Sequence, residues 1–279
     1  MKETLTYYKD WTWQTPIRDK ARNLVRNTII RGLSVGRSLN HSTNWIRFPF
    51  YHHVFQDEQQ NFARHLGYLR DYGDFISVDD ALSLLSDGGK INGRYFCLSL
   101  DDGLKSCYNG AMPILSELNI PAVFYVVTKM VGRSLEADDP IARNVFGFKG
   151  RNTTLDFLSW DNCLEMISAN MTIGSHSTTH TRLSDLTEDQ TRIEMENSKT
   201  EIEQNTGQPC RHFCPPYGIP NTDYDAVVDV ELAKSSGYKT LATGIRGPNR
   251  QGDSPFALKR DHLLAGWENF QLRYFLSLD

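Results

Sequence analysis

The chain has 279 residues, of which 39 % are hydrophobic and 23 % charged, and its formal net charge is −4. This length suits one large domain or two small ones, and the composition is that of an ordinary soluble globular protein. The net acidity argues against a protein dedicated to nucleic-acid binding. No apolar run approaches the roughly 20 residues that cross a bilayer.

The N-terminus and the cysteines both bear on location. Residues 1–10 lack the apolar core and the small-residue cleavage site of a secretory signal. The five cysteines are scattered, with no CxxC pair, so we expect free thiols in a reducing compartment. The cytoplasm is the expected location. The cysteines are Cys97, Cys107, Cys163, Cys210 and Cys214.

Residues 16–39 are expected to form a helix, with Pro16 in its first turn and apolar residues at helical spacing. This segment carries six basic residues and a single acid, Asp19. A basic amphipathic helix can lie on an anionic membrane surface. The alternative is a helix that packs against the domain with its charges in solvent. Both interpretations are open at this stage.

Strands and helices alternate along the rest of the chain, which predicts a parallel α/β arrangement, most simply a barrel. A Gly-, Arg-, Asn- and Asp-rich segment at 132–154 is expected to be a long irregular excursion. Expected strands are 46–54, 75–78, 95–103, 122–127, 171–175, 212–214, 238–243 and 256–258. Expected helices are 57–70, 79–85, a segment around 112–118, 161–169 with Ser159 as its cap, 187–205, 223–236 and 267–277.

The stretch Tyr95–Gly103 begins as a buried strand and stops at two adjacent acids, Asp101 and Asp102, before a glycine. Two neighbouring carboxylates at a strand end repel each other and resist burial, and a bound cation would offset that cost. The glycine would let the backbone turn sharply enough for both acids to serve one site. Asp-Gly is also common in turns, so a plain strand-ending turn is the alternative.

Two histidines, His176 and His180, follow another expected strand at a spacing of four residues. One turn of helix would put both imidazoles on one side, where a single metal ion could bind both. This spacing alone is weak, because surface histidines often fall four apart. In a (β/α) barrel, however, the strand ends converge on one mouth. The histidines and the aspartates together therefore predict a two-His, one-carboxylate metal site with open positions, which is a catalytic arrangement.

Three segments, in this order, resemble the motifs of the polysaccharide deacetylase family, the NodB-homology carbohydrate esterases. Leu98–Gly103 is similar to T/S-F-D-D-G, His176–His180 to H-S/T-x-x-H, and Phe213–Gly218 to F-R-P-P-Y-G. Phe50–Val54 and Leu158–Trp160 resemble the family's opening strand and the helix start before the histidine strand. The resemblance covers residues 46–265.

The resemblance implies a distorted (β/α) barrel that binds one divalent metal ion, commonly Zn²⁺. It implies Asp101 as the catalytic base that takes a proton from the attacking water. It implies a backbone N–H after Pro215 and Pro216, that of Tyr217, as a donor to the oxyanion. The implied metal ligands are Asp102, His176 and His180.

Two features depart from the family pattern. The arginine of the third motif, which orients the base, is Cys214 here, and a thiol cannot replace a guanidinium group. Arg260 is the best candidate to substitute for it. The late leucine-histidine motif that provides a general acid is also absent, and His262 is the nearest candidate, with a surface histidine as the alternative.

Three further residues near the expected site could have either a functional role or a purely structural one. His52 and His53 lie on the opening strand, where a core or rim position is expected rather than a role as ligands. Trp160 could stack on a sugar ring beside Pro216 and Tyr217, or could simply pack the start of its helix.

The leading hypothesis is a metal-dependent hydrolase that removes N-acetyl groups from an amino-sugar glycan or its precursor. One alternative is a deformylase or another deacylase, acting on a sugar or a small molecule. Another is a catalytically silent carbohydrate-binding barrel, suggested by the missing arginine. Because Asp101, Asp102, His176 and His180 are all present, a catalytically inactive protein is disfavoured.

We expect one domain with an N-terminal helical extension, namely an extension over 1–45 and a polysaccharide deacetylase-like domain over 46–279. The expected partner is an N-acetylated sugar or polysaccharide precursor and not nucleic acid. A peripheral membrane contact through residues 16–39 would suit a lipid-linked precursor.

Overall fold

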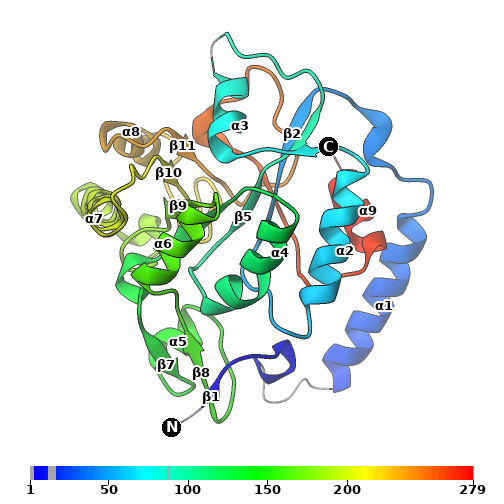
Figure 1. The fold of residues 1–279 in the computed structure, drawn as a ribbon, viewed down its shortest axis with the longest axis horizontal. Helices are drawn as coiled ribbons and strands as arrows, with labels where there is room; N and C mark the ends of the chain where they lie inside the picture. The colour runs from blue at the N-terminus through cyan, green and yellow to red at the C-terminus, as the bar shows by residue number, and fades with distance from the viewer. Residues whose placement is uncertain (1–2, 12–16, 87, 279) are drawn as a thin grey trace.

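The structure is a computed structural model that describes residues 3–11, 17–86 and 88–278 (Figure 1). Its main sheet is parallel throughout, as expected when helical connections return each strand in the same direction. Its strands are β2 (Trp45–Tyr51), β3 (Asp74–Phe75), β4 (Arg94–Phe96), β5 (Leu98–Leu100), β6 (Ala122–Val126), β9 (Thr172–Ser175), β10 (His212–Phe213), β11 (Thr240–Leu241) and β12 (Arg260–His262).

The strands follow the order β11-β10-β9-β6-β5-β2, and β12 pairs with the other edge of β2. The two ends of this path meet at one parallel bridge, between Ala242 and Leu258. There the Thr243 N–H donates to the Leu258 carbonyl at 2.8 Å. The strands therefore curve into a ring closed by a single bridge, and the predicted α/β fold with a distorted barrel is confirmed.

The helices of Figure 1 cover the outside of this ring. Predicted caps are found where expected, because Ser159 and Thr187 each accept the N–H three residues on and complete a capping box. The α-helices around the ring are α2 (Gln59–Arg70), α3 (Val78–Leu85), α4 (Met112–Glu117), α6 (Trp160–Ser168), α7 (Glu188–Thr206), α8 (Val228–Ser235) and α9 (Asn269–Leu276). All five cysteines are buried and free, as predicted.

The predicted irregular excursion is wrong, because the segment has its own secondary structure. It contains β7 (Ser134–Glu136), α5 (Pro140–Asn144) and β8 (Thr153–Asp156). β8 pairs with β7 and also with β1 (Glu3–Thr4), which ties the N-terminal segment to the excursion. A second apolar cluster, including Phe148, lies under this small sheet.

Two predicted elements also need correction. The expected strand at 256–258 is a 3₁₀ turn, Pro255–Ala257, in which Ser254 caps the Phe256 N–H, and the strand starts two residues later as β12. The helix predicted at 223–236 starts only at Val228, because the Asp225 carboxylate holds the preceding turn by accepting the N–H groups of Val227 and Val228.

The helix predicted at 16–39 is α1 (Ile17–Leu33), and Pro16 lies outside the described residues. The chain leaves the helix through Gly36, which has a φ of +76°. α1 packs against α9 on the right of Figure 1. Among the described residues, no helix combines the length and apolar character needed to cross a membrane.

Candidate active site

The Asp101–Gly103 turn follows β5 at the carboxyl end of the ring. Asp101 donates its N–H to the Tyr51 carbonyl, as a continuing strand residue would. Asp102 and Gly103 then both take left-handed conformations, with φ of +70° and +69°. Because the chain leaves the strand at this point, both carboxylates line one cavity while contacting different partners.

Asp102 lies against the two histidines predicted with it. Its Oδ1 is 3.4 Å from His176 Nε2 and 3.2 Å from His180 Nε2. His176 donates from Nδ1 to the Cys214 carbonyl at 2.7 Å, which leaves its Nε2 atom facing Asp102. The three side chains are buried, and this donor set fits one divalent metal ion of the Zn²⁺ type.

The histidine segment is not a helical turn, so that prediction is wrong. Ser177 and His180 both have a φ of +65°, and the chain forms a tight loop. Glu194 of α7 holds this loop by accepting the Thr178 N–H at 2.9 Å and the Thr179 N–H at 2.8 Å. The two imidazoles therefore converge through loop geometry, and Glu194 is a supporting residue that no motif revealed.

Asp101 forms a buried ion pair with Arg260 from β12. The Arg260 Nη1 atom is 2.8 Å from Asp101 Oδ1, and both side chains are 3 % exposed. Arg260 Nη2 also donates to the Cys214 thiol sulfur at 3.0 Å. The guanidinium group thus lies beside Cys214, the position of the family arginine. It contacts the Asp101 carboxylate from β12 rather than from the third motif.

The charge of Asp101 depends on this pair. Burial alone would raise the pKa of the carboxyl group, but the Arg260 guanidinium opposes burial and holds the pKa below its ordinary value. Asp101 is therefore ionised at neutral pH.

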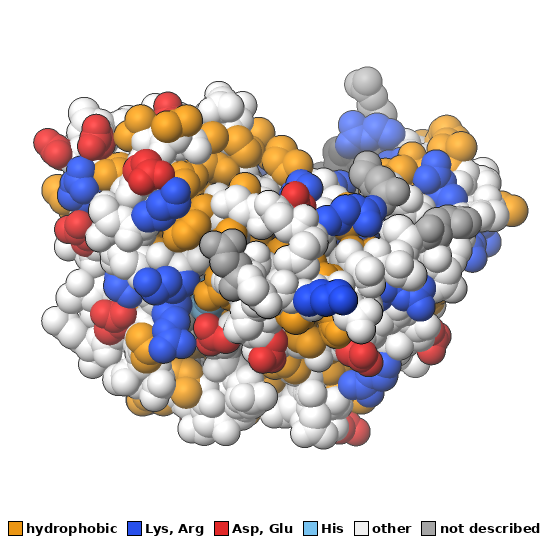
Figure 2. Space-filling model, turned by 90° about the horizontal axis from the view of Figure 1, so that it is seen from above, with side chains coloured by type: hydrophobic (Ala, Val, Ile, Leu, Met, Phe, Trp, Pro, Cys, Tyr) orange, Lys and Arg blue, Asp and Glu red, His pale blue; other side chains and the backbone are white. Residues whose placement is uncertain are grey.

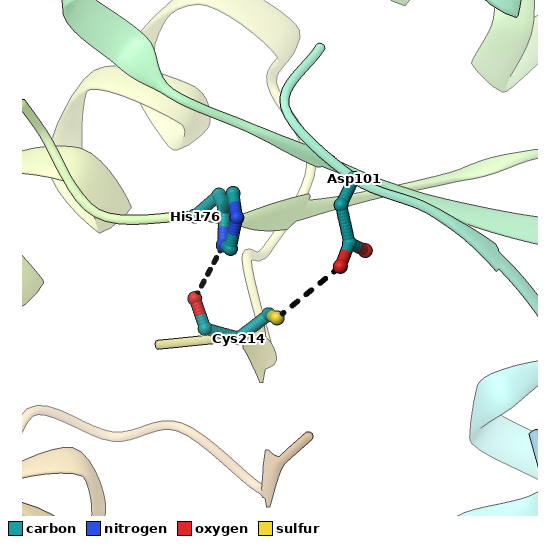
Figure 3. A group of neighbouring side chains, drawn as sticks. All are labelled: Asp101, His176 and Cys214. Atoms are coloured by element: carbon teal, nitrogen blue, oxygen red, sulfur yellow. Dashed lines mark hydrogen bonds between the residues drawn. The ribbon is translucent and has the colours of Figure 1, made fainter. Parts of the chain in front are cut away.

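Cys214 contacts the two neighbours drawn in Figure 3. Its carbonyl accepts from His176, and its thiol points at Asp101 Oδ2, 3.8 Å away. These three residues also lie close enough to hold a metal ion. We favour the Asp102 set, because His176 Nδ1 is occupied and the Arg260 guanidinium beside the sulfur would repel a cation.

The Pro-Pro-Tyr-Gly turn follows β10. Tyr217 has a φ of +64°, and its ring stands at the cavity rim with 45 % of the residue exposed. Its ring contacts His180 at a centroid distance of 5.2 Å. Among the described residues, the Tyr217 N–H has no hydrogen-bond acceptor. Pro216 lies in this turn but does not line the cavity, whereas Pro215 does.

A cavity of about 330 Å³ collects these groups, and a larger one of about 850 Å³ adjoins it. The two share Tyr8, His53 and Leu264. The smaller cavity holds Asp101, Asp102, His176, His180, Tyr217, Arg260 and His262, all of which the sequence predicted as site residues.

His262 pairs with His52 inside the smaller cavity. His52 Nδ1 and His262 Nε2 are 3.1 Å apart and share a hydrogen bond. Burial, together with the neighbouring His52 and Arg246, lowers the pKa of His262 to about 3. Its imidazole is therefore uncharged at neutral pH, and His52 lines the same cavity without being one of the candidate metal ligands.

Two of the aromatic side chains at the cavity come from the N-terminal segment. Tyr8 and Trp11 line it, and the Tyr8 ring stacks on His53 at a centroid distance of 5.2 Å. Trp160 starts α6 and packs against the main core instead, outside the cavity lining. The sequence predicts no helix or strand around Trp11, so it did not identify Tyr8 and Trp11 as residues of the site.

Comparisons with known proteins agree with this architecture. The family model described as polysaccharide deacetylase matches residues 88–241. YxkH of Bacillus subtilis (strain 168) is 22 % identical over 209 residues, which cover 75 % of this chain and 66 % of that relative.

Solved structures show the same fold. The structure of IcaB from Ammonifex degensii superposes with a TM-score of 0.68 at 23 % identity, over 84 % of this chain and 98 % of that one. The Streptococcus pyogenes deacetylase PplD, in complex with acetate, gives 0.65 at 20 % identity, over 84 % and 98 %. A de-N-acetylase from Aggregatibacter actinomycetemcomitans gives 0.63 at 21 % identity, over 83 % and 100 %. With its family model matching more than half of the sequence, the chain belongs to the polysaccharide deacetylase family, a family of hydrolases.

Proposed function

We propose that the protein is a metal-dependent hydrolase that removes N-acetyl groups from an amino-sugar glycan or its precursor. The observation that carries this proposal is the placement of two buried carboxylates with separate partners in one cavity. Asp102 faces two imidazole nitrogens, whereas Asp101 faces a guanidinium group. One carboxylate can thus hold a cation while the other remains free to accept a proton.

Asp102, His176 and His180 would hold one divalent metal ion, for which we propose Zn²⁺. When bound, this ion supplies Lewis acidity that polarises a carbonyl group and makes water easier to deprotonate. The Nε2 atom of His176 suits it as a ligand, because the other ring nitrogen already donates its proton to the Cys214 carbonyl.

Asp101 is the proposed general base that takes a proton from water as the water attacks the amide carbonyl. Arg260 keeps it ionised and fixes its orientation through the contact at 2.8 Å. The Tyr217 N–H, in the turn beside Pro216, is the proposed donor to the developing oxyanion.

The departing amine needs a proton, and His262 is the proposed donor. Because its imidazole is uncharged at neutral pH, it must first receive from Asp101 the proton that Asp101 takes from the attacking water. The hydrogen bond to His52 orients the ring for this relay.

For sugar binding we propose Tyr8 and Trp11, whose rings line the cavity, as stacking surfaces. Trp160 is no longer the favoured platform, since it does not line the cavity.

The test combines metal analysis with acyl release. The purified protein is loaded with Zn²⁺ and assayed for acetate from N-acetylglucosamine oligomers, with N-formylated oligomers in parallel. We expect about one metal ion per chain and acetate release that a chelator abolishes. Metal-loaded protein that releases no acyl group from either substrate would refute the proposal and favour a silent sugar-binding barrel.

Three sequence-based expectations stay proposals. They are the division into residues 1–45 and 46–279, the cytoplasmic location, and the membrane contact through residues 16–39.

A further inference from the structure

The outer helix α1 is oriented with its polar side toward the protein. Asn27 accepts a hydrogen bond from the Gln271 side chain of α9 at 3.4 Å, and Ser34, just past the helix end, accepts one from Arg273 at 3.2 Å. Ile30 is the buried apolar residue of this face, at 7 % exposed. A helix packed on a domain normally turns its apolar stripe inward, so the polarity of α1 is reversed.

The apolar residues of α1 face outward instead. Val25, Ile29 and Leu33 are spaced four apart and are 59 %, 55 % and 50 % exposed. Leu24 and Val35 are also exposed, at 69 % and 75 %, but Leu24 lines the cavity of about 850 Å³ and Val35 lies beyond the helix end. No other described helix carries three exposed large apolar side chains. A contiguous exposed apolar surface of this kind marks a contact site.

Basic side chains flank this stripe. Arg22 and Arg26 are exposed and lie next to this stripe, three residues before Val25 and Ile29. Arg31 lies on the α9 side of the helix, where its guanidinium group is over the Phe270 ring at 4.8 Å. Viewed from above, Figure 2 shows hydrophobic side chains beside Lys and Arg at the right-hand edge, the side on which α1 stands in Figure 1. An apolar stripe edged by cations matches a bilayer surface, where apolar side chains enter below anionic headgroups.

We propose that α1 docks the protein on an anionic membrane surface through Val25, Ile29 and Leu33, with Arg22 and Arg26 at the headgroups. A second copy of the chain is the competing occupant. In a twofold dimer formed along this stripe, the arginine side chains of the two copies would lie near each other. Repulsion between these like charges disfavours such a dimer.

The docked helix would bring the catalytic cleft to the membrane. Asn27 and Arg31 line the cavity of about 850 Å³, which adjoins the catalytic cavity. An N-acetylated sugar carried on a membrane lipid would meet the cleft from this side. This part of the inference rests on the proposed function.

The docking test uses sucrose-loaded vesicles of phosphatidylcholine with or without phosphatidylglycerol. We expect the protein to sediment with the anionic vesicles and to be released as salt is raised. The double substitution Val25→Gln with Ile29→Gln should lower the partition coefficient about tenfold or more. The matched control is Ile193→Gln with Val227→Gln, because these side chains are 55 % and 71 % exposed on other elements. The control should bind like the original protein.

Equal vesicle binding by both double variants would overturn the docking surface. A dimer in sedimentation velocity that the Val25 and Ile29 substitutions dissolve would assign the stripe to a second copy and overturn it as well.

The link to the substrate is tested with one N-acetylglucosamine oligomer, free or anchored in anionic vesicles by an alkyl chain. We expect the Val25 and Ile29 substitutions to slow acetate release only from the anchored form. An equal effect on both forms, or none, overturns the link. Failure of the original protein on both forms, with vesicle binding intact, counts against the proposed function alone.

Discussion

The ion pair between Arg260 and Asp101 gives the sharpest test of the proposed chemistry. We predict that Arg260→Met shifts the acid limb of the kcat/KM profile to higher pH. The two charged groups are 2.8 Å apart and 3 % exposed. Opposite charges near 4 Å interact by about 4 kcal/mol at an effective dielectric constant of 20, and an adjacent Arg lowers the pKa of an Asp by about 1–3 units.

The direction of the pH shift follows from the protonation state that Asp101 needs as a base. The base works only when ionised, and its depressed pKa keeps it ionised well into the acid range. Without Arg260, burial raises the pKa, so the base form is lost at a higher pH as the solution is acidified. The acid limb should rise by about 1–3 units. The unpaired buried carboxylate should also lower the free energy of unfolding by about 3–5 kcal/mol at neutral pH.

Arg47→Met is the matched control, because Arg47 forms a similar buried pair with Asp261 at 2.9 Å. It should lower stability by a comparable amount without moving the acid limb. The exchange Cys214→Arg with Arg260→Met should restore part of the profile, since the guanidinium group and the thiol sulfur are neighbours. The measurements are pH profiles of acetate release and thermal unfolding. An acid limb that stays in place in Arg260→Met would refute the assignment of Arg260.

Three more substitutions separate the parts of the site. Asp101→Asn should keep the bound metal and lower kcat about 10²–10⁴-fold, as measured by metal analysis and acetate release, and unchanged turnover would remove Asp101 as the base. Glu194→Gln should weaken zinc binding about 10–100-fold in a chelator competition, because the loop that carries both histidines loses its charged acceptor. An unaltered affinity would mean that the loop holds its shape without the carboxylate. Trp11→Ala should raise KM for oligomers and leave kcat near its original value, and a fall in kcat alone would contradict a binding role.

The strand-end motifs could be predicted because each places residues that are costly to bury at the end of an apolar run. Asp101, Asp102 and the histidine pair are such residues, and the parallel fold brings them to one mouth. Arg260 could be named only as the best candidate to replace the family arginine, since its contact with Asp101 depends on β12 closing the ring. The 256–258 segment looked equally fit for a strand, but Pro255 and the Ser254 cap turn it into a 3₁₀ helix.

Other features lack a local signal. The loop conformation at Ser177 and His180 needs Glu194, which is contributed by a helix beginning eight residues after His180. The periodicity of α1 identifies an apolar stripe, but periodicity does not say which side of a helix meets the domain. The polar partners on α9 decide that orientation.

The single bridge that closes the ring makes the β11–β12 junction a short seam in the sheet. β12 is paired along its length only with β2, so it can separate from β11 at the loss of few hydrogen bonds. Asp102 and His176 follow strands that are paired on both sides, whereas Arg260 and His262 lie on β12. The proposed metal ligands and the proposed base, Asp101, therefore follow strands that have neighbours on both sides. Arg260 and His262, which would keep the base ionised and pass on its proton, lie on the strand that closes the ring. Backbone amides at the seam should exchange with solvent sooner than those of β5, β6 and β9.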